Sequence, residues 1–256
     1  MAALAVQDLA VDFGGVAALA GVTFEVRPGT ITSLIGPNGA GKTTAFNAIT
    51  GYLRPRRGRV TFDGRPLTGL RPCDVAGHGV VRTFQKTSVF PALSVRDNVM
   101  IGLHLRGRSG LLAILAGRRA VAREEVQLAG DADGIIAFVG LEHRRDAIAS
   151  ALPYGEQRLV EVAVALAARP RLLLLDEPAA GMTGSEKDRL IELVRRVRGQ
   201  GVTVFLVEHD MRLVMGVSET VIVLNHGRVI AEGPPAAIQA HPDVIRAYLG
   251  SARAQA

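Results

Sequence analysis

Short runs of apolar residues, separated by glycine-containing or charged turns, recur along the chain and predict β-strands. They occupy residues 4–11, 22–26, 31–35, 60–62, 80–83, 172–175, 202–207, 221–224 and 229–230. The run at 172–175 is apolar at every position, which is typical of a strand covered on both faces of a parallel sheet. Residues 225–227 predict a hairpin turn between the last two runs.

Stretches with helical periodicity lie between these strands. They are expected at about residues 42–51, 155–168, 186–198, 235–239 and 242–249. Arg169-Pro170 ends the second of them, because proline cannot continue a helix. Strands that alternate with helices in this way predict an α/β fold.

The stretch from about residue 95 to residue 148 has a different pattern of residue types. Strand signals are missing there, and Leu, Ala, Arg and Glu recur at helical spacing, so an inserted helical subdomain is expected. Within it, residues 111–116 are apolar and are flanked by Arg108 and by Arg118-Arg119. This segment is either a helix that faces a membrane or a partner, or a packed helix with solvated arginines.

The bulk composition narrows the class of protein. A length of 256 residues suits one large α/β domain with or without an inserted subdomain. Hydrophobic residues make up 48% of the chain, which is enough for a sizeable core. The formal net charge of +6 fits an anionic partner or simply an arginine-rich proteome. Cys73 is the only cysteine, which excludes an internal disulfide and fits a reducing compartment.

The first motif with chemical meaning follows the run at 31–35. It reads Gly36-Pro37-Asn38-Gly39-Ala40-Gly41-Lys42-Thr43, with Thr44 after it, and matches the phosphate-binding loop G-x-x-x-x-G-K-[ST]. Its glycines allow backbone N–H groups to converge on phosphate oxygens, and the helix that follows adds the positive end of its dipole. Lys42 is expected to reach the β- and γ-phosphates of ATP, and the Thr43 hydroxyl is expected to ligate Mg²⁺.

A second motif is the apolar run at 172–175 that ends in Asp176-Glu177. An acid at the end of a strand beside a phosphate-binding loop can hold Mg²⁺ through water, and this role is expected of Asp176. Glu177 is placed to polarise an attacking water as a general base. The bland interpretation, a solvated acid pair at the end of a strand, is disfavoured by the phosphate-binding loop upstream.

Further motifs make the chain resemble the ABC ATPase superfamily over essentially its whole length. Residues 152–158, Leu-Pro-Tyr-Gly-Glu-Gln-Arg, resemble the signature motif, and residues 180–182 stand where the superfamily has its D-loop. Gln85 is similar to the Q-loop glutamine, His209 to the switch histidine and Phe13 to an aromatic residue that stacks on adenine. Each of these alone is more often an ordinary loop or core residue, so their order and spacing carry the resemblance.

The resemblance implies a P-loop NTPase core with a mostly parallel sheet, an N-terminal antiparallel β subdomain and an inserted helical subdomain, which together form the ABC ATPase fold. A single ABC ATPase domain would span residues 1–256. The core and the β subdomain would occupy about 1–94 and 170–256, and the helical subdomain with the signature motif about 95–169.

The resemblance also implies a head-to-tail dimer, in which the phosphate-binding loop of one subunit and the signature motif of the other enclose each ATP. The implied nucleotide contacts of the signature motif are Pro153, Tyr154, Gly155 and Glu156. Glu177, His209 and Gln85 would be catalytic, and Gln85 would also sense Mg²⁺ or water. Two departures stand out: Pro153 replaces a serine hydroxyl, and Thr183 replaces an aspartate of the D-loop.

Local strings narrow the resemblance to the ATPase subunits of high-affinity branched-chain amino-acid importers. The strings occupy residues 13–16, 46–51, 81–85, 177–182, 227–233 and 247–250. The implied partners are integral-membrane permease subunits, a second ATPase copy or close paralogue and, indirectly, an external solute-binding protein. No secretory signal or run of the ~18 apolar residues that span a bilayer is found, so a peripheral location on the cytoplasmic face of the inner membrane is expected.

Two other functions remain open from the sequence. A non-transport ABC ATPase would act on a nucleic-acid or ribosomal partner, and such proteins usually carry two cassettes or a long coiled-coil insertion. This chain has one cassette and only 4% aromatic residues, so no nucleic acid is expected. A regulatory ATP-binding module without turnover is disfavoured by Glu177 and His209.

Overall fold

The computed structural model describes residues 3–83, 89–104 and 118–253. These residues form two compact units. The first comprises Met1–Arg82, Arg171–Ala180 and Lys187–Ala256, and the second comprises Thr83–Pro170 and Gly181–Glu186. Among the described residues, no helix is long and apolar enough to cross a bilayer.

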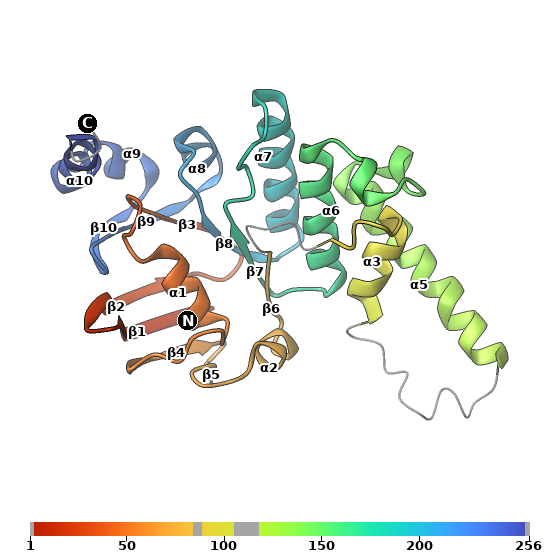
Figure 1. Cartoon of the computed structure of the whole chain (residues 1–256), viewed down its shortest axis with the longest axis horizontal. Helices are drawn as coiled ribbons and strands as arrows, with labels where there is room; N and C mark the ends of the chain where they lie inside the picture. The colour runs from red at the N-terminus through yellow and green to blue at the C-terminus, as the bar shows by residue number, and fades with distance from the viewer. Residues whose placement is uncertain (1–2, 84–88, 105–117, 254–256) are drawn as a thin grey trace. The chain divides into compact units, whose positions relative to one another are not determined.

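A six-stranded sheet forms the centre of the first unit (Figure 1). Its order is β10 (Arg228–Gly233), β9 (Thr220–Asn225), β3 (Ile31–Ile35), β8 (Thr203–Val207), β7 (Leu172–Asp176) and β6 (Val80–Arg82). All neighbours are parallel except β10, which pairs with β9 in the antiparallel sense. The predicted α/β class and the mostly parallel sheet are therefore confirmed. Parallel pairing brings the carboxyl ends of β3, β7 and β8 to the same edge, where α/β proteins bind ligands.

The second sheet of this unit is antiparallel throughout. Its order is β2 (Val16–Val26), β1 (Leu4–Phe13), β4 (Arg57–Phe62) and β5 (Arg65–Pro66). Strands β1 and β2 are longer than the apolar runs that predicted them, because hairpin pairing continues to Phe13 and Val16 on either side of the Gly14-Gly15 turn. The expectation of an N-terminal antiparallel sheet is confirmed.

The central sheet is covered on both faces, as its continuous apolar strands require. Alternate residues of one strand point to opposite faces. Leu34 therefore belongs to a core cluster with α1 (Lys42–Ile49) and the antiparallel sheet, whereas Ile35 belongs to a separate cluster. That second cluster includes Val214 of α8 (Met211–Val217), Ile238 of α9 (Pro235–Gln239) and Val244 of α10 (Pro242–Arg253).

The remaining helix boundaries lie close to those expected from periodicity. Helix α7 runs from Gly184 to Gly199, and its residues from Lys187 onward belong to the first unit. Two short helices were not predicted: α2 (Pro72–Gly77), of 6 residues, and α8, of 7 residues. Both are too short to show a helical period. Each begins with a local signal instead, a proline in the first turn of α2 and the N-cap side chain of Asp210 in α8.

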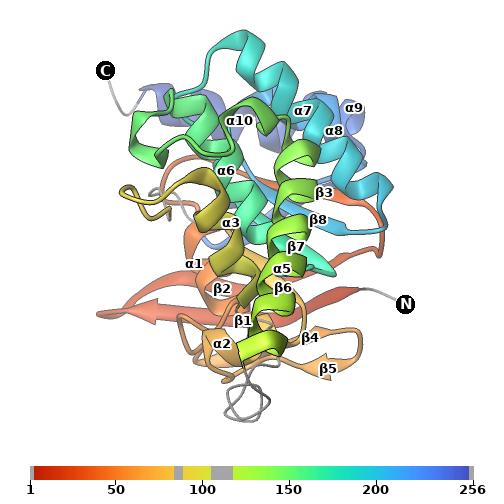
Figure 2. The same ribbon diagram turned by 90° about the vertical axis from the view of Figure 1, so that its right-hand side faces the viewer.

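The second unit is helical, as the helical spacing of residues in this part of the sequence predicts. Helices α3 (Val95–His104), α5 (Arg118–Val139) and α6 (Tyr154–Ala167) pack on one another, together with short 3₁₀ turns at Glu142–Arg144 and Ala149–Ala151 (Figure 2). Helices α3 and α6 approach closely at Gly102, where a Cβ atom would lie 2.7 Å from the Val164 carbonyl oxygen. An isolated bridge joins Ser94 and Ile148, in a stretch where no extended pairing was expected. The apolar segment 111–116 lies outside the described residues.

Candidate active site

The loop between β3 and α1 forms a backbone cradle at the edge of the central sheet. Gly36 has φ 153°, and a Cβ atom there would lie 2.1 Å from the Leu224 carbonyl oxygen. Gly41 has φ 107°, and a Cβ atom there would meet the Ala18 carbonyl oxygen at 2.7 Å. The two glycines are therefore required by backbone conformation and by close packing on neighbouring strands. Asn38, Gly39 and Thr43 are exposed, Pro37 and Thr44 are half-buried, and Ala40 is buried.

Lys42 is the cationic group of this cradle. It is the first residue of α1 and is buried, and its Nζ donates to the carbonyl oxygens of Gly36 at 2.7 Å and Pro37 at 3.1 Å. Burial lowers the pKa of Lys42, and the nearby carboxylates of Glu177 and Asp176 act in the opposite direction. The structure thus brings these three predicted site residues close together.

Asp176 ends β7 with a buried carboxylate. Its Oδ2 accepts a hydrogen bond of 2.6 Å from Nη2 of Arg82, which is also buried, at the end of β6. Nη1 of Arg82 donates to Asn47 Oδ1 of α1 at 2.7 Å. One guanidinium therefore joins β6, β7 and α1 next to the cradle. Sequence reasoning missed Arg82, although a basic residue at the end of a predicted strand was the available signal.

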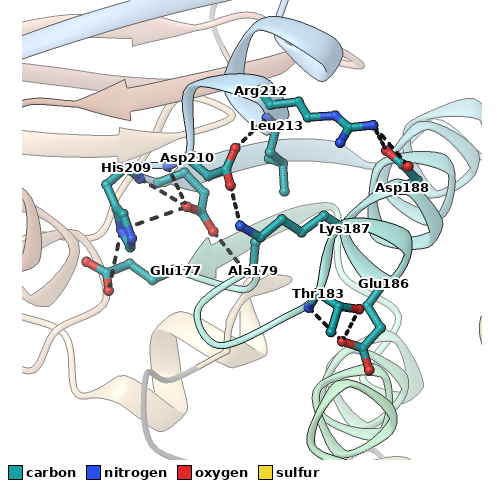
Figure 3. Close-up of polar contacts among 11 residues, drawn as sticks. Glu177, Ala179, Thr183, Glu186, Lys187, Asp188, His209, Asp210, Arg212 and Leu213 are labelled. Atoms are coloured by element: carbon teal, nitrogen blue, oxygen red, sulfur yellow. Dashed lines mark hydrogen bonds and ion pairs between the residues drawn. The ribbon is translucent and has the colours of Figure 1, made fainter.

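Glu177 and His209 lie beside each other after β7 and β8 (Figure 3). His209 Nδ1 is 4.0 Å from Glu177 Oε2, and both side chains are accessible to solvent. The backbone N–H of Glu177, with φ 48°, donates to the Val207 carbonyl oxygen at 2.9 Å and ties the end of β7 to the end of β8. A carboxylate and an imidazole in this position can together bind and deprotonate a water molecule.

The signature segment belongs to the helical unit, where it begins α6. Pro153 is the N-cap residue with extended backbone angles, and it is exposed together with Tyr154. Gly155 is buried, and a Cβ atom there would lie 2.2 Å from Glu186 Oε1. Glu156 Oε2 accepts a hydrogen bond of 3.1 Å from Arg144 Nε. The segment thus presents Pro153 and Tyr154 to solvent, while Gly155 and Glu156 are engaged within the unit.

Thr183 occupies the position where the D-loop aspartate was expected. Its backbone N–H and its hydroxyl both donate to Glu186 Oε2 at 2.8 Å (Figure 3). Thr183 directly precedes α7, and Glu186 is the third residue of that helix. Glu186 therefore supplies one half of a capping box, because its carboxylate accepts the backbone N–H of the residue before α7.

Phe13 and Gln85 are the two remaining predicted site residues. Phe13 ends β1, and 52% of its surface is exposed, so its ring is accessible for stacking. Gln85 lies outside the described residues.

Tyr248 is a residue whose position the sequence did not reveal. It lies in α10 and packs against the core cluster that contains Ile35, the residue before the cradle. Burial raises the pKa of its hydroxyl, and the nearby Gly36 backbone acts in the opposite direction. The C-terminal helix therefore supports the first residue of the phosphate-binding loop.

The central sheet carries a phosphate-binding loop after β3, an acid pair after β7 and a histidine after β8. Together with an antiparallel sheet and a helical unit, this arrangement defines an ATP-binding cassette. Residues 19–180 match the family model described as "ABC transporter". The chain therefore belongs to the ABC transporter family.

Within that family, residues 228–254 match the model described as "Branched-chain amino acid ATP-binding cassette transporter". The chain is 41% identical to the high-affinity branched-chain amino acid transport ATP-binding protein LivG of Escherichia coli K12, over 97% of this chain and 98% of LivG. It is likewise 41% identical to BraF of Pseudomonas aeruginosa, with the same coverage. The structure of the ADP conformation of an ABC transporter cassette superposes with a TM-score of 0.86, at 32% identity over 98% of this chain and 99% of that one.

Proposed function

We propose that this chain is the ATP-binding subunit of a branched-chain amino acid importer and that it hydrolyses ATP to drive uptake. The observation that carries the hydrolytic part is the grouping of Lys42, Glu177 and His209 at one edge of the central sheet. The names of the relatives favour transport over an ABC ATPase that acts on nucleic acid or the ribosome.

The cradle has the features needed to bind the phosphates of ATP. Its glycines bring the backbone close to neighbouring strands, and the exposed residues Asn38, Gly39 and Thr43 leave one side accessible. Lys42 stands at the start of α1 as a desolvated cation, and the helix adds its positive end. Phe13, exposed at the end of β1, would stack on the adenine.

The residues at the cradle also fit Mg²⁺, which would neutralise phosphate charge when bound. Among the described residues, no group of three His, Cys, Asp or Glu side chains could hold a metal alone. Mg²⁺ takes one or two protein ligands together with waters and substrate phosphates. The Thr43 hydroxyl would be a direct ligand, and Asp176 would act through water because its Oδ2 already accepts from Arg82. Gln85 remains a predicted further contact.

Glu177 would accept the proton of the attacking water, and His209 would orient that water against the γ-phosphate. The signature segment, with its exposed residues Pro153 and Tyr154, would contact the nucleotide of a second ATPase subunit across a head-to-tail dimer. In the helical unit, the exposed apolar side chains of Phe90, Leu93 and Ile148 suit a permease contact. An external solute-binding protein would act through those permease subunits, and the chain would lie at the cytoplasmic face of the membrane.

The test uses three proteins in a phosphate-release assay with MgATP: wild type, Lys42→Ala and Glu177→Gln. We expect turnover by wild type only. Lys42→Ala should bind MgATP about 10- to 150-fold more weakly in calorimetry, because a charged hydrogen bond is worth about 1.5–3 kcal/mol. Glu177→Gln should keep its affinity, since the amide has the same shape but is a poor base. Unchanged affinity in the first variant, or wild-type turnover in the second, would contradict the assignments.

The transport part has its own measurement. Uptake of radiolabelled leucine, isoleucine or valine by cells or vesicles that contain the chain with its permease should depend on Glu177. Phosphate release without any such uptake would keep the ATPase and reject the proposed solute.

A further inference from the structure

Glu208 is a buried carboxylate that neither the motifs nor the expected chemistry uses. It lies between the end of β8 and His209, and its side chain is 0% exposed. Its Oε1 accepts the backbone N–H of Ala179 at 2.8 Å. Its Oε2 accepts the backbone N–H groups of His209 at 3.0 Å and Asp210 at 3.2 Å (Figure 3). Three backbone donors from two separate segments thus converge on one side chain.

These two segments carry the residues expected to act on water. Ala179 stands two positions after Glu177, and His209 directly follows Glu208. The Glu177 backbone is also tied to β8 through the Val207 carbonyl oxygen. His209 Nδ1 and Glu177 Oε2, 4.0 Å apart, are thus carried by two backbone segments that the Glu208 carboxylate joins.

A second polar contact extends the same link to α7. Asp210 Oδ2 accepts a hydrogen bond of 2.5 Å from Lys187 Nζ, and Asp210 Oδ1 caps α8 through the Leu213 N–H. The segment 208–210 is in this way joined to the loop after β7 by Glu208 and to α7 by Asp210.

We propose that Glu208 is a positioning residue for ATP hydrolysis: it holds the Glu177 and His209 segments in one fixed arrangement through its three backbone hydrogen bonds. This inference rests on the proposed ATPase function. It differs from the roles of Glu177 and His209 because Glu208 is buried and its three hydrogen bonds accept from backbone N–H groups, while its Oε2 also lies 4.0 Å from His209 Nδ1.

The chemistry of the site requires a carboxylate. Two oxygens that only accept can satisfy the three N–H donors, whereas a glutamine offers one accepting oxygen and one NH₂ group that only donates. Glu208→Gln must therefore place a donor against at least one backbone N–H. Glu208→Asp keeps two accepting oxygens on a shorter side chain, so it should restore part of the effect of Glu208→Gln.

The experiment compares wild type, Glu208→Gln, Glu208→Asp and the control Glu192→Gln. Glu192 is a matched control because its side chain is 64% exposed on α7 and contacts only Arg195 in the hydrogen bonds of the described residues. We expect kcat to fall about 10- to 100-fold in Glu208→Gln, as a displaced catalytic geometry does, with the KM for MgATP changed less than about threefold. Glu208→Asp should lie between wild type and Glu208→Gln, and Glu192→Gln should match wild type.

Hydrogen exchange read by mass spectrometry supplies a second measurement. Exchange should rise in peptides that cover 176–183 and 207–211 of Glu208→Gln, and should stay unchanged in β3 and α1. A kcat of Glu208→Gln within about twofold of wild type would overturn the proposal. So would a raised KM for MgATP together with a rise of exchange across the whole first unit. If Glu208→Gln does not fold, the same measurements on Glu208→Asp decide. Wild type without phosphate release would instead reject the ATPase function, while the exchange data would still show whether the link exists.

Discussion

Gly155 has no side chain, and this leaves space for Glu186 at the start of helix α7. A Cβ atom at this position would lie 2.2 Å from Glu186 Oε1 and 2.5 Å from Glu186 Cδ. Glu186 is at the same time the acceptor for the backbone N–H and the hydroxyl of Thr183. The glycine of the signature segment therefore leaves room for the Glu186 carboxylate that caps the start of α7.

Gly155→Ala should lower the free energy of unfolding by about 0.5–2 kcal/mol, the usual cost of a lost cap, because Ala displaces Glu186 from Thr183. The measurement is a double-mutant cycle in urea with Glu186→Ala, which removes the obstructing side chain. Gly155→Ala should then cost much less in the Glu186→Ala background than in wild type.

The control is Gly134→Ala, because Gly134 lies in α5 of the same unit and a Cβ atom there meets nothing within 4 Å. That change should stabilise the protein by up to about 1 kcal/mol, as Ala is the better helix former. Effects of Gly155→Ala and Glu186→Ala that add within about 0.5 kcal/mol would show that the two positions are independent.

At the residue scale, motifs in the sequence singled out Lys42 and Glu177, and the resemblance singled out His209, as side chains expected to act through their own chemistry. Lys42, Glu177 and His209 stand in contiguous motifs, so their place in the sequence was enough to single them out. Arg82 and Glu208 were missed because each contacts groups on segments that are distant along the chain. Their partners become visible only when β6, β7 and β8 are paired.

At the element scale, α8 is the clearest case of a helix that depends on one residue. It has only 7 residues, and it begins at the Asp210 side chain, which accepts from the Leu213 N–H at 3.1 Å. The same carboxylate accepts from Lys187 Nζ, and this hydrogen bond, more than any other contact, lowers the pKa of Asp210. Cap and ion pair can be separated, because asparagine is as good an N-cap as aspartate but carries no charge.

Asp210→Asn should therefore cost only the ion pair, about 0–1 kcal/mol, whereas Asp210→Ala should cost a further ~0.5–2 kcal/mol for the cap. Chemical denaturation at pH 7 measures both. Because the folded pKa of Asp210 is lowered, the ion-pair contribution is fully present above the ordinary carboxyl pKa of 3.8 and is lost as the pH falls through the lower folded value. Equal losses in the two variants would mean that the cap contributes nothing.

Secondary structure was predictable where an element is long or wholly apolar. Strands β3, β7 and β8 are buried at all five positions, and their apolar runs were recognised with nearly correct ends. Helices α2 and α8 have only 6 and 7 residues, too few for a clear helical period, and both were missed, whereas the similarly short α9 was predicted. The extension of β1 and β2 beyond their apolar runs came from pairing with each other, a contact that no single run reveals.

At the scale of the whole molecule, Pro153 matters because in the proposed dimer the signature segment would contact the ATP bound by the other subunit. Pro153 is the N-cap residue of α6, without a side-chain cap hydrogen bond. A serine there could donate to the γ-phosphate bound by the other subunit, and it could also cap α6 within its own subunit. The two effects differ in their dependence on nucleotide, because only ATP has a γ-phosphate.

Pro153→Ser should tighten ATP-dependent dimerisation by about 10- to 150-fold, the equivalent of one well-aligned hydrogen bond to a charged group at about 1.5–3 kcal/mol. Sedimentation of the variant in the Glu177→Gln background, where hydrolysis cannot empty the site, gives the dimer dissociation constant. The same measurement with ADP is the control and should show no gain. An equal gain with both nucleotides would assign the effect to capping of α6 alone.

The sequence by itself determined the phosphate-binding loop, the acid pair and the α/β class. These depend on neighbouring residues: glycine spacing sets the loop, and continuous apolar runs require a sheet covered on both faces. Only the tertiary structure decided the strand order β10-β9-β3-β8-β7-β6, which brings Lys42, Glu177 and His209 to one edge. It also decided the role of Glu208, whose partner Ala179 is 29 residues away along the chain. The physical reason is that a buried carboxylate is stable only where donors surround it, and strand pairing is what assembles those donors.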